Sequence, residues 1–468
     1  MLETSNIDNI YSTANFFDED DYGLQPAQHN SESVGYFPGT LRADTFRVNP
    51  NYEINVFSGN GNINYGSGAY DTINLSNYTS AQIADYSSAK DGEGTLVNTG
   101  TGDRAFDSLT LTDGTEILFE GIERVVFSDR TFDQTTTPND PLFDQQWNLH
   151  MMGLQTAWNF STGSDDVLIG VQDTGLGIVG IENSIHPDIP ADETWVLSTN
   201  IRDDLFRTNF DGDFALQSTS HGTAVQGIIS ADTNNNVGIA GINWNSDVYN
   251  IDVIDGSPGD LDLATATRAM IAEATSNGQK LVINMSLEGS RLDPELEALI
   301  AANQDDVLFV IATGNGGADG VGDGLSSPAI YAQRYDNVIA VGASWGFTSE
   351  ITGRPVAPGT IATYSNRGQG LTLVAPTSVV TTQAVNTGQL NYDDDFNGTS
   401  AATPNAAGVA SLVWSANDDL TAPQVKAIMS ETAFDLGTPG YDLVYGHGFV
   451  NADAAVRRAV ALRPSEVA

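Results

Sequence analysis

The chain of 468 residues contains no cysteine. This absence excludes disulfide bridges, thiolate metal sites and a cysteine nucleophile. The fold is therefore held by its packed core, its hydrogen bonds or bound ions, and divalent cations are one physical route to added stability.

Positive charge is also scarce. Lys and Arg number 18 against 61 Asp and Glu, which gives a net charge of −43, and the only lysines are Lys90, Lys280 and Lys426. Because phosphate binding needs a basic surface, we expect no nucleic-acid partner, and an anionic membrane is disfavoured. Hydrophobic residues make up 40% of the chain, enough for a core. The acidic excess has two open interpretations: a solvated, salt-adapted surface, or calcium binding and attraction of cationic substrates.

Long apolar runs are missing as well. No stretch reaches the roughly 18 apolar residues that a membrane-spanning helix needs. Residues 1–30 have neither the basic nor the apolar region of a signal peptide. We therefore expect no membrane partner. An extracellular or periplasmic location is favoured, although this chain shows no signal peptide.

Composition divides the chain at residues 135–139, which we expect to form an exposed linker. Residues 40–134 are rich in Gly, Asn, Thr and Asp with short apolar runs, a pattern typical of β-structure. Residues 1–39 are expected to be poorly ordered or loosely attached. Residues 66–74 (GSGAYDTIN) resemble one nonapeptide of the calcium-binding RTX repeats. A plain β-turn is the alternative, because a single copy has no stacked neighbours with which to share ions.

The region 140–462 has a different pattern. Continuous apolar runs at 167–171, 281–284, 307–311 and 338–341 are typical of buried parallel strands, and a helix is predicted over 261–276. The sequence therefore predicts an α/β fold with a doubly wound, mostly parallel sheet, preceded by a smaller β-rich N-terminal domain. Active sites in such sheets lie at the carboxyl ends of the strands.

Three chemically suited residues follow such elements. Asp173 ends the first predicted strand, His221 is expected in the first turn of a helix, and Ser400 opens an Ala-rich helix. Singly, each has an ordinary interpretation as a turn residue, a core histidine or a helix cap. Together they suit nucleophilic acyl transfer, because the serine needs a base and the histidine needs an orienting carboxylate.

The motifs Asp173-Thr174-Gly175, His221-Gly222-Thr223 and Gly398-Thr399-Ser400 resemble the three signatures of the subtilisin-like serine proteases, in that family's order. The resemblance covers about 138–462. It implies that Asn315, in the segment ATGNGG, supplies a side-chain donor to the oxyanion beside the backbone N–H of Ser400.

Within the family, residues 139–147 and 314–324 are most similar to the kexin and proprotein-convertase branch, which is calcium-dependent. Two departures stand out. Thr174 occupies the place of a second acidic residue in that branch, and the chain stops soon after Ala452, without the branch's C-terminal β-rich domain.

The resemblance also implies a Ca²⁺ site. Carboxylates, amides and carbonyls on loops are the ligands that calcium prefers. The implied ligands are Asp140, Asp188, the amide of Asn235, the carbonyls of Val237 and Ile239, and Asp319 near the substrate pocket. The segment 211–213 (DGD) is a second, weaker candidate. Three ordinary polar loops remain the alternative.

An acidic set surrounds the expected substrate pocket, where we assign Ser286, Glu288, Asp293 and Asp323 to substrate binding. Glu288 stands where the family more often has glycine. An acidic pocket would pair with Arg or Lys in the residue before the scissile bond of a protein or peptide substrate.

The N-terminal region is expected to act as a prodomain and intramolecular inhibitor of a zymogen, cut near Arg130. Two rival hypotheses are a catalytically silent protein of the same fold and an RTX-like calcium-binding module. Intact Asp173, His221, Ser400 and Asn315 argue against the first, and the single nonapeptide argues against the second.

Overall fold

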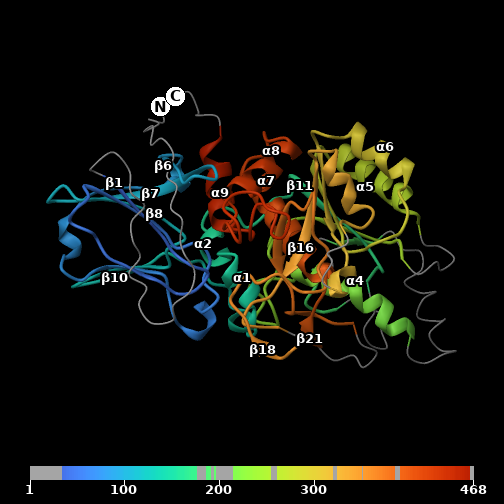
Figure 1. Cartoon of the computed structure of the whole chain (residues 1–468), viewed down its shortest axis with the longest axis horizontal. Coiled ribbons are helices and arrows are strands. Elements are labelled where there is room, and N and C mark those ends of the chain that lie inside the picture. Colours follow the sequence, from blue (N-terminus) through green and yellow to red (C-terminus); the bar gives the residue numbers. More distant parts are fainter. Residues whose placement is uncertain are drawn as a thin grey trace.

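The computed structural model describes residues 34–176, 186–190, 194–196, 214–254, 261–319, 324–349, 351–384 and 391–463. A β-rich part, residues 34–134, lies beside an α/β part that begins at residue 140 (Figure 1). We call these parts the β-domain and the α/β-domain.

The β-domain is a parallel coil in which the chain alternates between two sheets. Three passes run from one sheet to the other, as β1 to β2, β3 to β4 and β8 to β9, and equivalent strands of the passes pair in parallel. Antiparallel strands extend the two sheets to six and four strands. The strands are β1 (Val34–Pro38), β2 (Thr45–Phe46), β3 (Ile54–Ser58), β4 (Thr72–Leu75), β5 (Ile83–Ser87), β6 (Thr95–Asn98), β7 (Asp103–Leu111), β8 (Glu116–Glu120), β9 (Arg124–Phe127) and β10 (Thr131–Asp133).

The expected β-structure is confirmed, but the expectation that residues 1–39 are loose is wrong for their described part. Strand β1 lies inside the segment 1–39 that is expected to be loose. It is ordered there because it pairs with β3 along its whole length. Residues 1–33 lie outside the described residues. The expected linker is attached: the N–H of Thr136 donates to the carbonyl of Gln155 (2.8 Å), and the Thr137 hydroxyl bonds the Tyr65 hydroxyl (3.0 Å).

The α/β-domain is built on a seven-stranded sheet in the order β12-β13-β11-β14-β15-β16-β19, with every neighbouring pair parallel. Its strands are β11 (Val167–Asp173), β12 (Thr194–Val196), β13 (Val248–Asp252), β14 (Lys280–Met285), β15 (Val307–Ala312), β16 (Val338–Ser344) and β19 (Leu373–Pro376). Small antiparallel pairs are β17 (Thr348–Ser349) with β18 (Arg354–Pro355), and β20 (Val379–Thr382) with β21 (Tyr392–Phe396). The four predicted apolar strands are therefore confirmed.

Helices cover both faces of this sheet, since every residue of the central strand β11 is buried and successive side chains point to opposite faces. In β11, Ile169 and Val171 pack with Val225 of α4, whereas a Cβ on the intervening Gly170 would lie 2.5 Å from the sulfur of Met270 in α5. Successive side chains of a strand point to opposite faces, so α4 and α5 lie on opposite sides. The helices are α1 (Trp147–Met151), α2 (Leu154–Ala157), α4 (Phe214–Ser230), α5 (Leu263–Asn277), α6 (Pro294–Ala302), α7 (Thr399–Ala416), α8 (Ala422–Thr432) and α9 (Ala452–Ala461).

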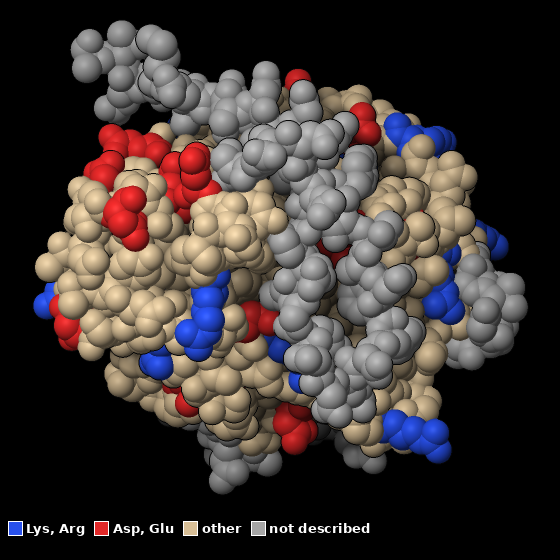
Figure 2. All heavy atoms as spheres, turned by 60° about the vertical axis from the view of Figure 1, so that its left-hand side comes forward, with Lys and Arg blue, Asp and Glu red and all other residues tan. Residues whose placement is uncertain are grey.

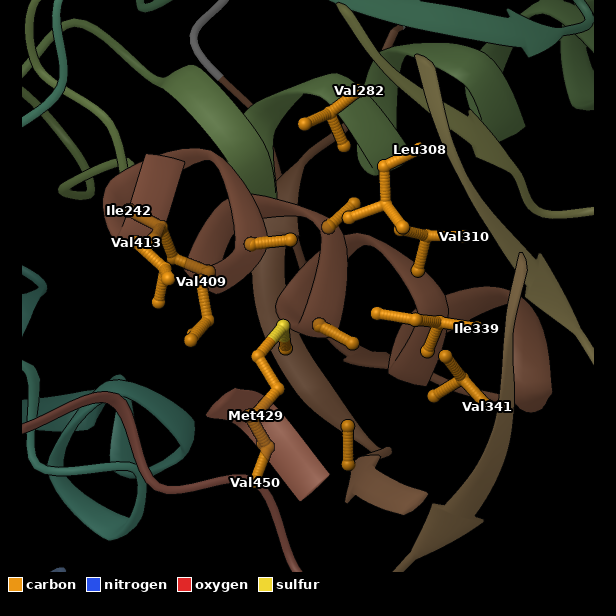
Figure 3. Packing of buried hydrophobic residues seen from close by; sticks show 14 of the residues in the cluster. Ile242, Val282, Leu308, Val310, Ile339, Val341, Val409, Val413, Met429 and Val450 are labelled. Atoms are coloured by element: carbon orange, nitrogen blue, oxygen red, sulfur yellow. The ribbon is translucent and has the colours of Figure 1, made fainter. Parts of the chain in front are cut away.

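The central core forms between the sheet and α7. Figure 3 shows Val282, Leu308 and Val310 of neighbouring strands beside Val409 and Val413 of the helix. Because α7 is buried along nearly its whole length, its first turn is held rigidly over the carboxyl ends of the strands. The packing thus fixes the position of Ser400.

No helix among the described residues is long and apolar enough to cross a membrane. On the face shown in Figure 2, Asp and Glu side chains gather at the upper left, and Lys and Arg side chains are dispersed.

Candidate active site

Asp173 and His221 form the charged half of the site. Asp173 is the last residue of β11 and is fully buried, and its Oδ1 accepts a hydrogen bond from His221 Nδ1 at 2.7 Å. The N–H of Thr174 donates to the same oxygen at 2.8 Å. The Thr174 hydroxyl accepts from the N–H of Gly222 at 2.9 Å and so ties the β11 end to α4. The carboxylate therefore fixes both the orientation and the tautomer of His221.

His221 lies in the middle of α4, about two turns after its first residue. The expectation that it lies in the first turn is wrong, since the helix begins at Phe214. Burial alone lowers the pKa of His221, but the charge and hydrogen bond of Asp173 outweigh it and raise the pKa above the usual 6.5. The Phe396 ring packs edge-on against the imidazole at 5.3 Å between centroids. The His221 side chain is 30% exposed, so a substrate can reach it.

Ser400 is brought to the same edge by α7 and β14. It is the second residue of α7, whose N-cap is Gly398, so the serine is not itself the cap. Its hydroxyl donates to the carbonyl of Ser286 at 3.1 Å, and the Ser286 hydroxyl donates back to the carbonyl of Ser400 at 3.0 Å. Ser286 directly follows β14, the neighbour of β11 that ends at Asp173. Hydrogen bonds between catalytic groups often form only with substrate bound, so the present bond of the hydroxyl to Ser286 is compatible with a role as nucleophile.

Two hydrogen-bond donors face the space beside Ser400. The Asn315 Oδ1 accepts from the N–H and hydroxyl of Thr399 at 2.9 and 3.1 Å, which leaves its amide Nδ2 as a free donor. A Cβ placed on Gly398 would lie 3.5 Å from Asn315 Nδ2 and 3.6 Å from the Ser400 nitrogen. Within the described residues, no hydrogen bond partner takes the Ser400 N–H. Both donors therefore suit an oxyanion.

Thr399 is a functional residue that the sequence reasoning missed. It orients Asn315, and it stands inside the serine motif next to Ser400, so its position was the available signal. Tyr364 was also missed: its hydroxyl accepts from the N–H of Gly398 at 3.1 Å. No local pattern marks Tyr364, because only the fold brings it there.

The predicted acidic pocket is only partly assembled. Glu288 is exposed, and its Oε2 accepts from the Ser326 hydroxyl (3.0 Å) and the Asn315 N–H (3.4 Å). Asp293 instead caps α6, where its Oδ1 accepts from Glu295 and Leu296 N–H groups at 2.9 and 3.2 Å. Asp319 ends the short helix η5 (Gly316–Asp319), and Asp323 lies outside the described residues.

Part of the predicted calcium set lies together, around Asp188 and the loop 235–239, whereas Asp319 lies apart at the end of η5. Asp188 Oδ1 accepts from the Asn235 amide at 3.0 Å, and its Oδ2 accepts from the N–H of Ile239 at 3.0 Å. Burial raises the pKa of Asp188 to about 7, and the charge of Asp140 adds to the rise. Asp140 Oδ1 is buried without a partner. This uncompensated negative charge fits a divalent cation.

The rest of the set consists of neutral oxygen donors. Val237 lies in the same loop, with its N–H donating to Asn235 Oδ1 at 2.6 Å. Among the described residues, no three or more His, Asp or Glu side chains form a metal cluster, so a cation bound here would also need carbonyl or amide ligands. The segment 211–213 lies outside the described residues.

Comparison with known proteins matches this chain to the Subtilase family over residues 164–448. Alkaline elastase YaB of Bacillus sp. is 36% identical over 51% of this chain and 55% of its own length. Subtilisin Savinase of Lederbergia lenta is 31% identical over 66% of this chain and 98% of its own length. An extracellular protease of Xanthomonas campestris is 33% identical over 71% of this chain and 59% of its own length.

A solved structure, described as proteases from Pseudoalteromonas arctica, matches with a TM-score of 0.52 and 26% identity, over 69% of this chain and 100% of that chain. The relatives are bacterial proteases named as subtilisins, alkaline proteases or an elastase. The expected membership of the kexin and convertase branch is therefore corrected to the subtilisin-like proteases.

Proposed function

The chain belongs to the subtilase family of serine endopeptidases, and from this premise we propose that it hydrolyses protein substrates with Asp173, His221, Ser400 and Asn315 as its catalytic residues. The hydrogen bond of 2.7 Å between His221 and buried Asp173, at the edge where α7 presents Ser400, carries the proposal.

The reaction follows from the positions of these groups. His221 Nε2 removes the proton of Ser400 as the serine oxygen attacks the scissile carbonyl, and Asp173 stabilises the imidazolium. Asn315 Nδ2 and the Ser400 N–H bind the oxyanion. The imidazolium then returns the proton to the leaving amine, and water, deprotonated by His221, hydrolyses the acyl-enzyme.

A fluorophosphonate probe tests this assignment. It should label the wild-type chain at Ser400 and fail to label the Ser400→Ala variant. His221→Ala should be labelled far more slowly, because the serine loses its base. Absence of labelling in the folded wild-type protein would favour the catalytically silent alternative.

For specificity, we propose a preference for Arg or Lys before the scissile bond, carried by Glu288. Its carboxylate is exposed beside the oxyanion residue Asn315, and among the described residues no Lys or Arg forms an ion pair with it. The name of the elastase relative points to the other outcome. Fluorogenic peptides that differ only in that residue decide between them: equal rates for Arg, Phe and Ala peptides would reject the preference.

We also propose calcium dependence through Asp140, Asp188, Asn235, Val237 and Ile239. Calcium at 100 times its Kd would stabilise the fold by about 2.7 kcal/mol. EDTA should therefore lower Tm, excess Ca²⁺ should restore it, and Asp188→Asn should abolish this response. The matched control is Asp306→Asn, an exposed partner of Lys280, which should respond as the wild type does.

The homologous extracellular protease supports a location outside the cytoplasm.

The sequence predicts that the N-terminal region acts as an intramolecular inhibitor that is cut near Arg130. Arg130 is exposed in the turn between β9 and β10, so a cut there is sterically possible. Within the described residues, however, no hydrogen bond or ion pair joins residues 34–134 to Asp173, His221 or Ser400.

A further inference from the structure

The β-domain docks on one side of the α/β-domain. Its interdomain contacts include α1, α8, α9 and the short helix η4 (Phe143–Gln145), and Gln155 of α2 donates to Glu123 of the β-domain at 2.8 Å. The proposed catalytic residues lie elsewhere, on β11, α4 and the first turn of α7 (Figure 1). The contact therefore involves the first helices of the α/β-domain and its last two helices, α8 and α9, and these elements do not carry the proposed catalytic residues.

Buried charges form the first part of this contact. Arg457 of α9 binds Asp107 of β7 through Nη1 and Asp453 through Nε, both at 2.8 Å, and each of these side chains is at most 5% exposed. Asp453 Oδ2 also accepts from the N–H of Gly121 in the β-domain at 2.8 Å. Without the β-domain, Arg457 would lose one carboxylate and Asp453 would lose one donor.

A second arginine, Arg104, belongs to the β-domain and contacts α8 of the α/β-domain. Arg104 of β7 binds Glu120 through Nη1 at 2.6 Å and donates through Nη2 to the carbonyls of Thr432 (2.9 Å) and Ala433 (3.2 Å). These carbonyls end α8. A helix leaves its last carbonyls unpaired, so Arg104 completes the C-terminus of a helix in the other domain.

Apolar packing is continuous across the contact. Leu41, Ile63 and Tyr65 of the β-domain belong to the same core cluster as Leu149 and Met151 of the α/β-domain. The backbones approach closely there: a Cβ on Gly61 would lie 1.7 Å from the carbonyl oxygen of Met151. Only glycine allows this approach, and the N–H of Asn62 donates to the carbonyl of His150 at 2.9 Å beside it.

We infer that residues 34–134 are a permanent structural part of the active enzyme, on which α8 and α9 complete their folding, and not a segment whose removal exposes the catalytic residues. Separating the domains would leave Asp107 without its arginine and the last carbonyls of α8 without Arg104, and it would divide a core; each of these changes is costly. The inference does not rest on the proposed proteolytic activity, since its main test uses a variant without the nucleophile.

A nicking experiment tests the inference on the full chain. A recognition sequence for a site-specific protease is inserted into the exposed turn at 128–130 of the Ser400→Ala variant. After cleavage, the two fragments should elute together in gel filtration and separate only in denaturant. A fragment ending near residue 130 that elutes alone in native buffer would overturn the inference.

The same insertion in the wild-type chain gives the functional readout. Rates on a small peptide substrate before and after nicking should agree within about twofold, because the β-domain contacts leave the catalytic residues untouched. A tenfold or greater rise after nicking would show release of an inhibitor and reject the inference. Failure of labelling by the fluorophosphonate would reject the proposed function alone.

Arginine substitutions test whether the stability of the full chain depends on the contact between the two domains. Arg457→Ala should lower Tm by about 5–10 °C, because two buried carboxylates lose their partner. Arg268→Ala, which removes an exposed pair with Glu295, should change Tm by about 1 °C or less. If Arg457→Ala does not fold, Asp107→Asn serves instead, and its nicked fragments should separate at a lower urea concentration. Equal Tm values for the two arginine variants, or an unchanged urea midpoint for Asp107→Asn, would contradict the inference.

Discussion

Asp173 and Asp453 are both buried carboxylates, but their partners differ. Asp173 binds a histidine whose side chain is 30% exposed, whereas Asp453 binds Arg457, which is 5% exposed. A histidine can gain and lose a proton near neutral pH, and an arginine cannot. The difference teaches that burial of an acid marks a catalytic site only when its partner is titratable and can reach the substrate.

The largest effect is expected when the pair of Asp173 and His221 is broken. Asp173→Asn should reduce kcat by about 10⁴-fold, because the amide no longer stabilises the imidazolium or its productive tautomer. Tm should change little. Asp453→Asn, the matched change in the structural pair, should lower Tm and leave the kcat of the folded enzyme near that of the wild type. Steady-state kinetics and calorimetry on both variants make the comparison, and a reversed pattern would exchange the two roles.

Two asparagines allow a second comparison. Asn315→Ala should reduce kcat by about 10²–10³-fold with KM little changed, because one oxyanion donor is lost. Asn337 is a buried amide whose Nδ2 donates to the carbonyls of Ile300 and Val307 at 3.1 and 3.0 Å. Asn337→Ala should therefore lower Tm without a comparable loss of kcat. Similar kcat values for the two variants would exclude Asn315 as a donor.

Two acids near the substrate pocket allow a third. Glu288→Gln should reduce the ratio of kcat/KM for Arg over Phe peptides by about tenfold or more, as expected for loss of a charge-assisted hydrogen bond. Asp293→Asn weakens only the cap of α6, so it should cost about 1 kcal/mol of stability and leave the ratio unchanged. An unchanged ratio in Glu288→Gln would move the specificity to another residue.

The smallest expected effect is a shift of the pH profile. As the proposed general base, His221 must be neutral, and Asp173 raises its pKa, so kcat/KM should rise with pH through a pKa above 6.5. In Asp173→Asn the charge is gone and burial remains, which moves this acidic limb to lower pH. Burial lowers the pKa of His150 to about 4, so His150→Gln should leave the limb in place. A limb that stays at the same pH in Asp173→Asn would show that His221 does not control it.

The chemistry-bearing residues could be predicted because short segments carry them. Asp173, His221, Ser400 and Asn315 each stand in a motif next to an apolar strand or helix, and parallel strands bring their carboxyl ends to one edge. The position of His221 in α4 could not be predicted, because residues before a motif decide where a helix begins. The cap role of Asp293 was missed for a related reason, since Asp before Pro294 suits both a cap and a pocket.

The sequence by itself determined the absence of thiol chemistry, the buried parallel strands and the choice of the proposed catalytic residues, since these depend on residue type and local periodicity. Tertiary structure alone decided that Thr399 holds Asn315, that the β-domain is a parallel coil, and that Arg104 and Arg457 join the two domains. The physical reason is separation along the chain: Arg457 and Asp107 are 350 residues apart, and no local pattern encodes such a contact. Positive charge is scarce in this chain, and two of its arginines, Arg104 and Arg457, are buried where the domains meet.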